Sequence, residues 1–217
     1  MIGQRVVAEA VSRDHEVRAF TRNQSKIPAD ASPVTWQVAD VLDVDSITTA
    51  IIGLDVVVNA INAGDDIPDT IANAEVFPGA ATALLAALDR HPSTRLLIVG
   101  GAGSLEVEPG LQLVDVDDFA EQLPALLGVP PEYSKVVLAH REALNLYRLS
   151  NRDWTYVSPS AALVNSGERT GRFRTGANQL LVMEDGTSDI SAEDLAVALI
   201  DEAERPQFIQ RRFTVGY

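Results

Sequence analysis

Residues 95–104 have the sequence Arg-Leu-Leu-Ile-Val-Gly-Gly-Ala-Gly-Ser, an apolar run that ends in glycines. Such a run is typical of a strand buried on both faces of a parallel sheet, and the glycines predict a sharp turn after it. The run Leu-Asp-Val-Val-Val-Asn at 54–59 predicts a second strand of the same kind. These two stretches decide the fold, because strands buried on both faces need helices on either side.

Helices and strands alternate along the rest of the chain. We expect helices at 2–13, 45–52, 78–90, 119–127, 131–149 and 191–204, and further strands at 16–21, 34–38, 154–158, 180–183 and 213–215. The alternation predicts one α/β domain over residues 1–217, a Rossmann-like, doubly wound parallel sheet. A segment at about 159–190 that contains several glycines is expected to form a small region on the substrate side.

The predicted order begins with a helix rather than a strand. In doubly wound nucleotide-binding folds the first strand lies centrally, in the order 3-2-1-4-5-6. We therefore expect the strand at 16–21 to lack a neighbour on one side, and we expect the gene to start upstream of Met1. Whether the 217 residues bind a nucleotide by themselves is left open.

The composition excludes several classes of function. The chain has no cysteine and only three scattered histidines, so we expect no disulfide and no metal site. A formal net charge of −14 disfavours binding to nucleic acid or to an anionic membrane surface. No apolar stretch approaches the ~20 residues of a membrane span, and no signal-peptide pattern is present, so we expect a cytoplasmic protein.

Short motifs follow the predicted strands in a characteristic order. Met1-Ile2-Gly3 before a helix resembles the tail of a Gly-Ala-Thr-Gly-x-x-Gly fingerprint, without the first strand and the two earlier glycines. After the later strands come Thr21-Arg22-Asn23, Asp40-Val41, Asn59-Ala60, Gly100-Gly101-Ala102-Gly103-Ser104 and Ser158-Pro159-Ser160-Ala161. Together with the C-terminal stretches Gly167–Gly171 and Ser191–Ala196, these motifs resemble the atypical short-chain dehydrogenases of the NmrA-like and NADH-flavin-reductase type.

The resemblance implies a nicotinamide dinucleotide as cofactor. The residues that it places around the cofactor are Gly3, Thr21, Arg22, Asn23, Asp40, Val41, Asn59, Ala60, Gly101, Pro159 and Ser160. Gly3 would open the helix whose N-terminus faces the diphosphate. Arg22 stands where an acidic residue would bind a ribose 2′-hydroxyl, and because a guanidinium suits a 2′-phosphate, we expect NADP rather than NAD. Asp40 is equally well explained as a turn residue.

Ser104 and Tyr133 are the candidate catalytic residues. The resemblance places Ser104 where a serine hydroxyl polarises the substrate, although a turn-capping serine is an equal alternative. The superfamily's Tyr-x-x-x-Lys pair is broken, because Val137 follows Tyr133 at that spacing. Lys135 lies only two residues on, about 160° around the helix. Tyr133 therefore either lines the pocket or has an ordinary packing role.

These observations favour an NAD(P)H-dependent oxidoreductase with a small-molecule substrate. Without the tyrosine–lysine pair, a flavin, a quinone or a related acceptor fits better than a simple ketone. The alternative is a non-catalytic NADP(H)-binding redox sensor that acts through a protein partner. The arginines at 169–174 would recognise an anion or lie on solvated surface, and a homodimer is an assembly that the sequence leaves open.

Overall fold

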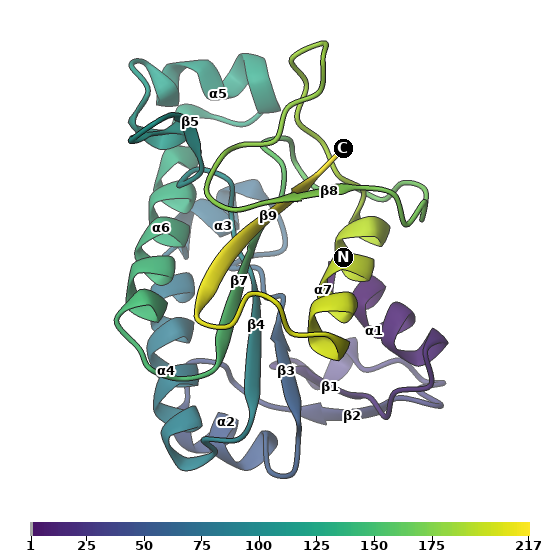
Figure 1. Ribbon diagram of the computed structural model, residues 1–217. Helices are drawn as coiled ribbons and strands as arrows, with labels where there is room; N and C mark the ends of the chain where they lie inside the picture. Colours follow the sequence, from purple (N-terminus) through teal and green to yellow (C-terminus); the bar gives the residue numbers. More distant parts are fainter. Residues whose placement is uncertain (1) are drawn as a thin grey trace.

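A five-stranded sheet lies at the centre of the molecule (Figure 1). The computed structural model describes residues 2–217. All neighbouring strands of this sheet are parallel except for the last pair, in which the edge strand is antiparallel. In spatial order the strands are β3 (Val56–Asn59), β4 (Arg95–Val99), β7 (Trp154–Ser158), β9 (Arg211–Gly216) and β8 (Arg174–Gly176). The expected Rossmann-like α/β architecture is confirmed.

β1 (Arg18–Thr21) and β2 (Thr35–Val38) form a separate parallel pair. Among residues 2–217, β1 pairs only with β2 and β3 only with β4, so no ladder joins the two sheets. The strand predicted at 16–21 thus lacks a neighbour on one side, as expected. One expectation is wrong: Val56, Val57 and Val58 are only half-buried, because one edge of β3 is unpaired. β4 has a strand on each side and is buried as predicted.

Helices cover both faces of the five-stranded sheet (Figure 1). α1 (Ile2–Ser12) and α7 (Ala192–Glu204) pack together on one face, and α2 (Val44–Ala50), α4 (Val76–Arg90) and α6 (Ser134–Arg148) lie on the other. Successive side chains of β4 enter different apolar clusters, since Leu96 and Ile98 face α4 and α6 whereas Leu97 faces α1 and α7. This alternation is what a pleated strand between two helical layers requires.

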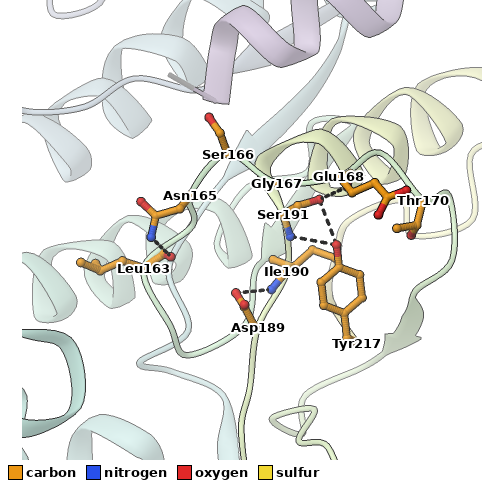
Figure 2. A pocket seen from close by; sticks show the side chains of 10 residues that line it. All are labelled: Leu163, Asn165, Ser166, Gly167, Glu168, Thr170, Asp189, Ile190, Ser191 and Tyr217. Atoms are coloured by element: carbon orange, nitrogen blue, oxygen red, sulfur yellow. Dashed lines mark hydrogen bonds between the residues drawn. The ribbon is translucent and has the colours of Figure 1, made fainter.

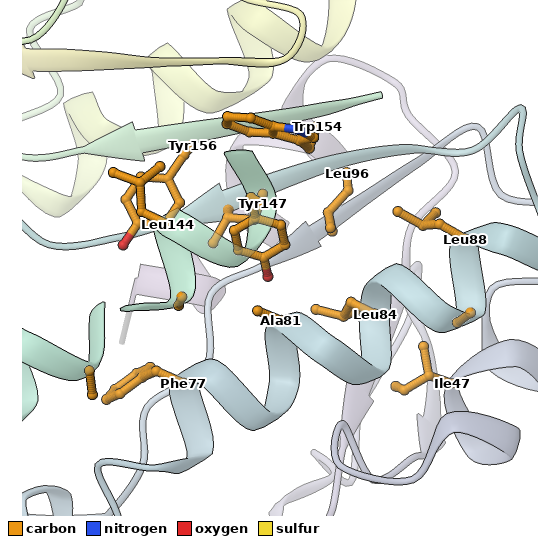
Figure 3. Packing of buried hydrophobic residues seen from close by; sticks show 14 of the residues in the cluster. Ile47, Phe77, Ala81, Leu84, Leu88, Leu96, Leu144, Tyr147, Trp154 and Tyr156 are labelled. Atoms are coloured by element: carbon orange, nitrogen blue, oxygen red, sulfur yellow. The ribbon is translucent and has the colours of Figure 1, made fainter. Parts of the chain in front are cut away.

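The larger apolar cluster packs α4 and α6 against β4 and β7 (Figure 3). The Tyr147 ring lies 6.0 Å from that of Trp154 and 6.2 Å from that of Tyr156, measured between centroids. On α4, Ala81 and Ala87 are fully buried, and these small side chains let the helix approach its neighbours closely. Burial of each large apolar side chain contributes about 1.5–3 kcal/mol, so this cluster is a main source of stability.

The connecting regions contain more regular structure than the sequence predicted. α3 (Ile67–Ala72) follows β3 and is capped at its N-terminus by Asp66, whose carboxylate accepts a hydrogen bond from Asp69 N at 2.8 Å. The segment at 106–118 forms a hairpin of β5 (Glu106–Glu108) and β6 (Leu111–Gln112), followed by a short 3-10 turn. α5 (Phe119–Leu127) has its predicted bounds.

The expected strand at 180–183 is wrong. The edge strand is β8, which pairs with β9 through residues that carry no apolar run. Leu181 is apolar for another reason: it packs beside Gly176 and Gly216, where an added Cβ would lie 3.3 Å and 3.4 Å from its side chain. Contact between distant segments, rather than local hydrophobicity, therefore selects the strand here. The rest of the segment at 159–190 is mostly irregular.

Candidate functional site

The first turn of α1 lies against the end of β3. A Cβ added to Gly3 would be 3.8 Å from the Ala60 Cβ and 4.0 Å from the Ala60 carbonyl oxygen. The structure thus brings together two residues that the sequence resemblance assigned to one site. Helix geometry leaves the first N–H groups of α1 without intrahelical partners, and no acidic residue occupies its first turn. This helix end has the donors and the polarity that suit an anion.

The residues after β1 form a tight polar turn. Asn23 N donates to Thr21 Oγ1 at 3.2 Å, and the Asn23 side chain accepts from Ser25 N at 2.9 Å. Arg22 is exposed in this turn, and within residues 2–217 its guanidinium makes no hydrogen bond or ion pair. The conformation of the turn is therefore set by Thr21 and Asn23, which leaves Arg22 available to a ligand.

An ion pair connects this turn to the loop after β3. Lys26 Nζ lies 2.6 Å from an oxygen of Asp65, and both side chains are exposed. The hydrogen bond from Lys26 holds the pKa of the Asp65 carboxyl below its usual value. The pair links the two sheets at the side where Arg22 lies.

Asp40 and Asn59 use their side chains to shape the backbone. The Asp40 carboxylate accepts from Leu42 N at 3.0 Å, and Asp40 N is hydrogen-bonded to Ser46 Oγ at 3.1 Å. Asn59 is buried, and its Oδ1 accepts from Ile61 N at 3.4 Å. Val41 packs against the larger apolar cluster. These contacts give Asp40 the turn role that was one of its two alternatives, while it remains exposed at the sheet edge.

The glycines after β4 permit close packing on β7 and α6. A Cβ on Gly100 would lie 1.9 Å from the Tyr156 ring, and a Cβ on Gly103 would lie 2.0 Å from Val137 Cγ1. Gly101 N points toward the Tyr156 hydroxyl at 3.4 Å, and that hydroxyl donates to the His140 carbonyl at 3.0 Å. A side chain at position 100 would therefore overlap Tyr156, and one at position 103 would overlap Val137.

Besides Asn59, three of the predicted site residues lie inside the protein. Ser104 is 3% exposed, Ser160 is 2% exposed and Pro159 is buried. Ser104 accepts a hydrogen bond from Arg212 at 2.9 Å, whereas Ser160 Oγ has no partner within residues 2–217. Arg212 was not predicted from the sequence. In the sequence, the one indication of its role is that Arg212 lies in the last strand, where polar residues alternate with the apolar Phe213 and Val215.

The tyrosine–lysine pair is absent in space as well as in sequence. Tyr133 ends a 3-10 turn (Pro131–Tyr133) and is partly buried, and this burial raises the pKa of its hydroxyl. Lys135 is exposed, and Val137 occupies the position of the pair's lysine. The His140 ring packs against that of Phe77 with centroids 3.9 Å apart and planes tilted by 33°. Burial lowers the pKa of His140 to about 4, so its ring is neutral at pH 7.

The cavity shown in Figure 2 lies beside α1, and none of the predicted site residues lines it. Its volume is about 370 Å³. Arg5 of α1 donates to Ser166 at 2.8 Å on its wall, and the Tyr217 hydroxyl donates to Ser191 Oγ at 2.9 Å. Its lining residues are Leu163, Asn165, Ser166, Gly167, Glu168, Thr170, Asp189, Ile190, Ser191 and Tyr217.

The arginines at 169–174 are used mainly within the protein. Arg169 forms an ion pair with Glu9 at 2.7 Å, and Arg174 donates to the Val182 carbonyl at 2.7 Å. Arg172 is exposed. Arg169 therefore links this loop to α1, and Arg174 links it to the backbone at Val182.

Comparison with known proteins identifies the family. The sequence profile of a family described as NAD(P)H-binding matches residues 1–206. The chain belongs to this NAD(P)H-binding family. The uncharacterized protein YwnB of Bacillus subtilis is 34% identical over 218 residues, which cover 98% of this chain and 92% of YwnB.

Two solved structures are similar over almost the whole chain. A putative exported protein from Burkholderia pseudomallei is 41% identical with a TM-score of 0.83, and the match covers 100% of this chain and 95% of that one. A putative NADH-flavin reductase from Streptococcus pneumoniae TIGR4 is 29% identical with a TM-score of 0.78, and the match covers 99% and 93%. The resemblance to the NADH-flavin-reductase type of atypical short-chain dehydrogenase is confirmed.

The donors at the candidate site fit a nicotinamide dinucleotide. The N-terminus of α1 suits a diphosphate, and the free guanidinium of Arg22 suits a phosphate. Within residues 2–217, no helix is long and apolar enough for a bilayer crossing, and no cluster of three metal-ligating side chains occurs.

Proposed function

We propose that the protein is an NAD(P)H-dependent oxidoreductase that uses NADPH to reduce a flavin, a quinone or a related small acceptor. Family membership and the similarity to the pneumococcal protein support the oxidoreductase class. The preference for NADPH and the class of acceptor come from this chain's own residues.

The valine at position 137 is the observation that supports a quinone or flavin as the acceptor. Where a ketone reductase of the superfamily needs a lysine near its tyrosine, this chain packs a valine against Gly103. Tyr133 is left with a raised pKa, which makes its hydroxyl a poor proton donor. A quinone or flavin suits such a site, because its π system spreads the charge gained on reduction.

Each part of the site then has one task. When bound, the reduced nicotinamide supplies a hydride. The N-terminus of α1 binds the diphosphate, and Arg22 binds the 2′-phosphate that distinguishes NADPH from NADH. The turn at 100–104 is held in shape by its packing on Tyr156 and Val137. The neutral ring of His140 adds no charge beside that turn.

Oxidation of NADPH and NADH with FMN, menadione and benzaldehyde tests this function. We expect turnover with FMN or menadione, little with benzaldehyde, and a higher kcat/KM for NADPH than for NADH. Arg22→Ala is expected to raise the Kd for NADPH about tenfold and to leave that for NADH unchanged. Arg205→Ala, an exposed arginine at the far end of α7, is the control. If no acceptor is turned over, the proposed oxidoreductase activity is rejected.

A redox sensor is the second candidate, and the burial of Ser104 and Ser160 favours it. Neither hydroxyl is presented to a substrate in this conformation. Tight binding of NADPH without turnover, together with a partner whose affinity depends on the oxidation state of the nucleotide, would select the sensor.

A further inference from the structure

Arg212 on β9 is a buried cation without an acidic partner. Its residue is 7% exposed, and among residues 2–217 its guanidinium donates to Ser104 and Asn178 rather than to a carboxylate. Burial, together with the charge of Arg148, lowers the pKa of its guanidinium to about 10, so it remains charged at pH 7. A buried charge is costly unless neighbouring groups stabilise it, so the hydrogen-bond partners of Arg212 matter.

The hydrogen bonds of Arg212 fix both the backbone and the side chain of Ser104. Its Nη1 donates to the Ser104 carbonyl oxygen at 2.8 Å and to Ser104 Oγ at 2.9 Å. Its Nη2 donates to Asn178 Oδ1 at 2.8 Å. A guanidinium cannot accept a hydrogen bond, so Ser104 Oγ is the acceptor here. The hydroxyl hydrogen of Ser104 is left for another group, and no such acceptor occurs among residues 2–217.

Unsatisfied hydroxyls lie on the same face of the sheet. Ser158 of β7 is paired in register with Thr214 of β9, and Thr214 follows Arg212 by two residues, so its side chain projects from the same face. Ser158 Oγ and Thr214 Oγ1 are fully buried and have no partner within the described chain. This end of β7 and β9 therefore has an unusual density of polar groups without partners.

We propose that Arg212 is a positioning residue that holds Ser104 so that its hydroxyl donates to a quinone oxygen gaining negative charge. The inference rests on the proposed function and narrows its acceptor to the quinone class. A hydride forms a bond to the quinone, which becomes a hydroquinone monoanion while the dinucleotide becomes oxidised. The new oxyanion accepts the Ser104 hydrogen bond, and a proton from solvent completes the hydroquinone.

The segment at 178–180 is linked to Ser104 through Arg212, which donates to Ser104 Oγ and to Asn178 Oδ1. Glu106 N donates to the Asn178 carbonyl at 2.8 Å, and Leu180 N donates to the Glu106 carbonyl at 2.9 Å. These two hydrogen bonds hold the segment against the residue that follows Ser104 by two positions. Asn178 itself is exposed. The proposal includes an opening of this segment when the acceptor binds.

Menadione reduction by Ser104→Ala, Arg212→Met and Arg212→Lys tests the proposal. We expect Ser104→Ala and Arg212→Met each to lower kcat by about tenfold to a hundredfold, with the Kd for NADPH unchanged. The double variant should lose no more than either single variant, because both act through one hydrogen bond. Arg212→Lys should recover part of kcat, since an ammonium also donates to Ser104. Arg211→Met, at an exposed neighbouring position, is the control.

Binding of 4-nitrophenol in its neutral and anionic forms gives a readout that needs no turnover. The wild type should bind the phenolate more tightly than the phenol, and Arg212→Met should lose this preference even if its stability falls. Wild-type kcat and an unchanged phenolate preference in both Ser104→Ala and Arg212→Met would overturn the inference alone. A wild type without turnover would overturn the proposed function, and this inference with it.

Discussion

Val137 of α6 lies directly against Gly103, so closely that an added Cβ on the glycine would be 2.0 Å from its Cγ1. This contact joins the turn after β4 to the helix where the superfamily has its lysine. Val137 thus packs against the turn and also stands at the position where the lysine of the acid–base pair would be.

Gly103→Ala is expected to destabilise the protein by about 1–3 kcal/mol, because the new methyl group overlaps Val137. Val137→Ala in that background should restore part of the loss, since it removes the overlapping atoms. Urea denaturation of the single and double variants measures both effects. Strictly additive losses would contradict the contact.

The ion pair of Arg95 with Glu202 is buried and is expected to be sensitive to loss of one partner. Both side chains are under 10% exposed, and Glu202 also accepts from Phe208 N at 2.9 Å. Arg95→Met alone should cost about 3–5 kcal/mol, and the double variant with Glu202→Leu should cost less than the sum, because no isolated charge remains buried.

Arg90→Met is the matched control for that pair, because Arg90 and Asp45 are exposed and such pairs contribute about 0–1 kcal/mol. Chemical denaturation of all variants gives the comparison. A loss of under 1 kcal/mol for Arg95→Met would show that the buried pair is not needed.

Glu9 of α1 should contribute stability that depends on acid pH. A hydrogen bond from Arg169, assisted by Arg13, lowers its pKa from 4.5 to about 2. The folded state thus binds its proton less readily than the unfolded state, so this contribution is complete above about pH 4.5 and is lost as the pH falls toward 2. Glu9→Gln should cost about 1–3 kcal/mol at pH 7 and weaken the acid dependence. Glu108→Gln, at an exposed position of β5, is the control for denaturation curves between pH 3 and 7.

His140 should titrate with a midpoint near pH 4, because burial disfavours its charged form. Its neutral form is favoured in the folded state, so its contribution to stability falls as the pH drops from about 6.5 toward 4. NMR of the imidazole carbon-bound protons measures the midpoint. A value near 6.5 would mean that the ring is solvated.

Asp65 should compete with a nucleotide phosphate for Lys26, since the two side chains form an ion pair at 2.6 Å. If NADPH binds as proposed, Asp65→Asn is expected to tighten NADPH binding several-fold and leave NADH binding unchanged. Calorimetric titration at low and moderate salt measures this, because an exposed charge effect weakens with ionic strength. Equal changes for both nucleotides would contradict the competition.

Much of the fold could be predicted because burial leaves a periodic trace in the chain. The apolar runs at 54–59 and 95–99 predicted two strands of the main sheet, of which β4 is buried as expected, and α5 and β7 have their predicted bounds. Predictions failed where pairing between distant segments decides, as at β8, whose residues form a strand only because β9 lies beside them.

The candidate site divides in the same way. Arg22, Gly3 and Ala60 were predicted as site residues from their places beside predicted elements, and in the structure Gly3 and Ala60 lie close together. The surroundings of Ser104 could not be predicted, because its partner Arg212 is 108 residues away in sequence. A local pattern does not encode which side chains meet across such a separation.

The sequence by itself determined the alternation of helices and strands, the glycine turn after β4 and the loss of the Tyr-x-x-x-Lys pair. Each of these follows from residue type and spacing along one element. Only the tertiary structure decided that β8 is the edge strand beside β9, that Val137 packs against Gly103 and that Arg212 holds Ser104. Those relationships depend on strand register and on the packing of layers, which bring together residues that no local periodicity relates.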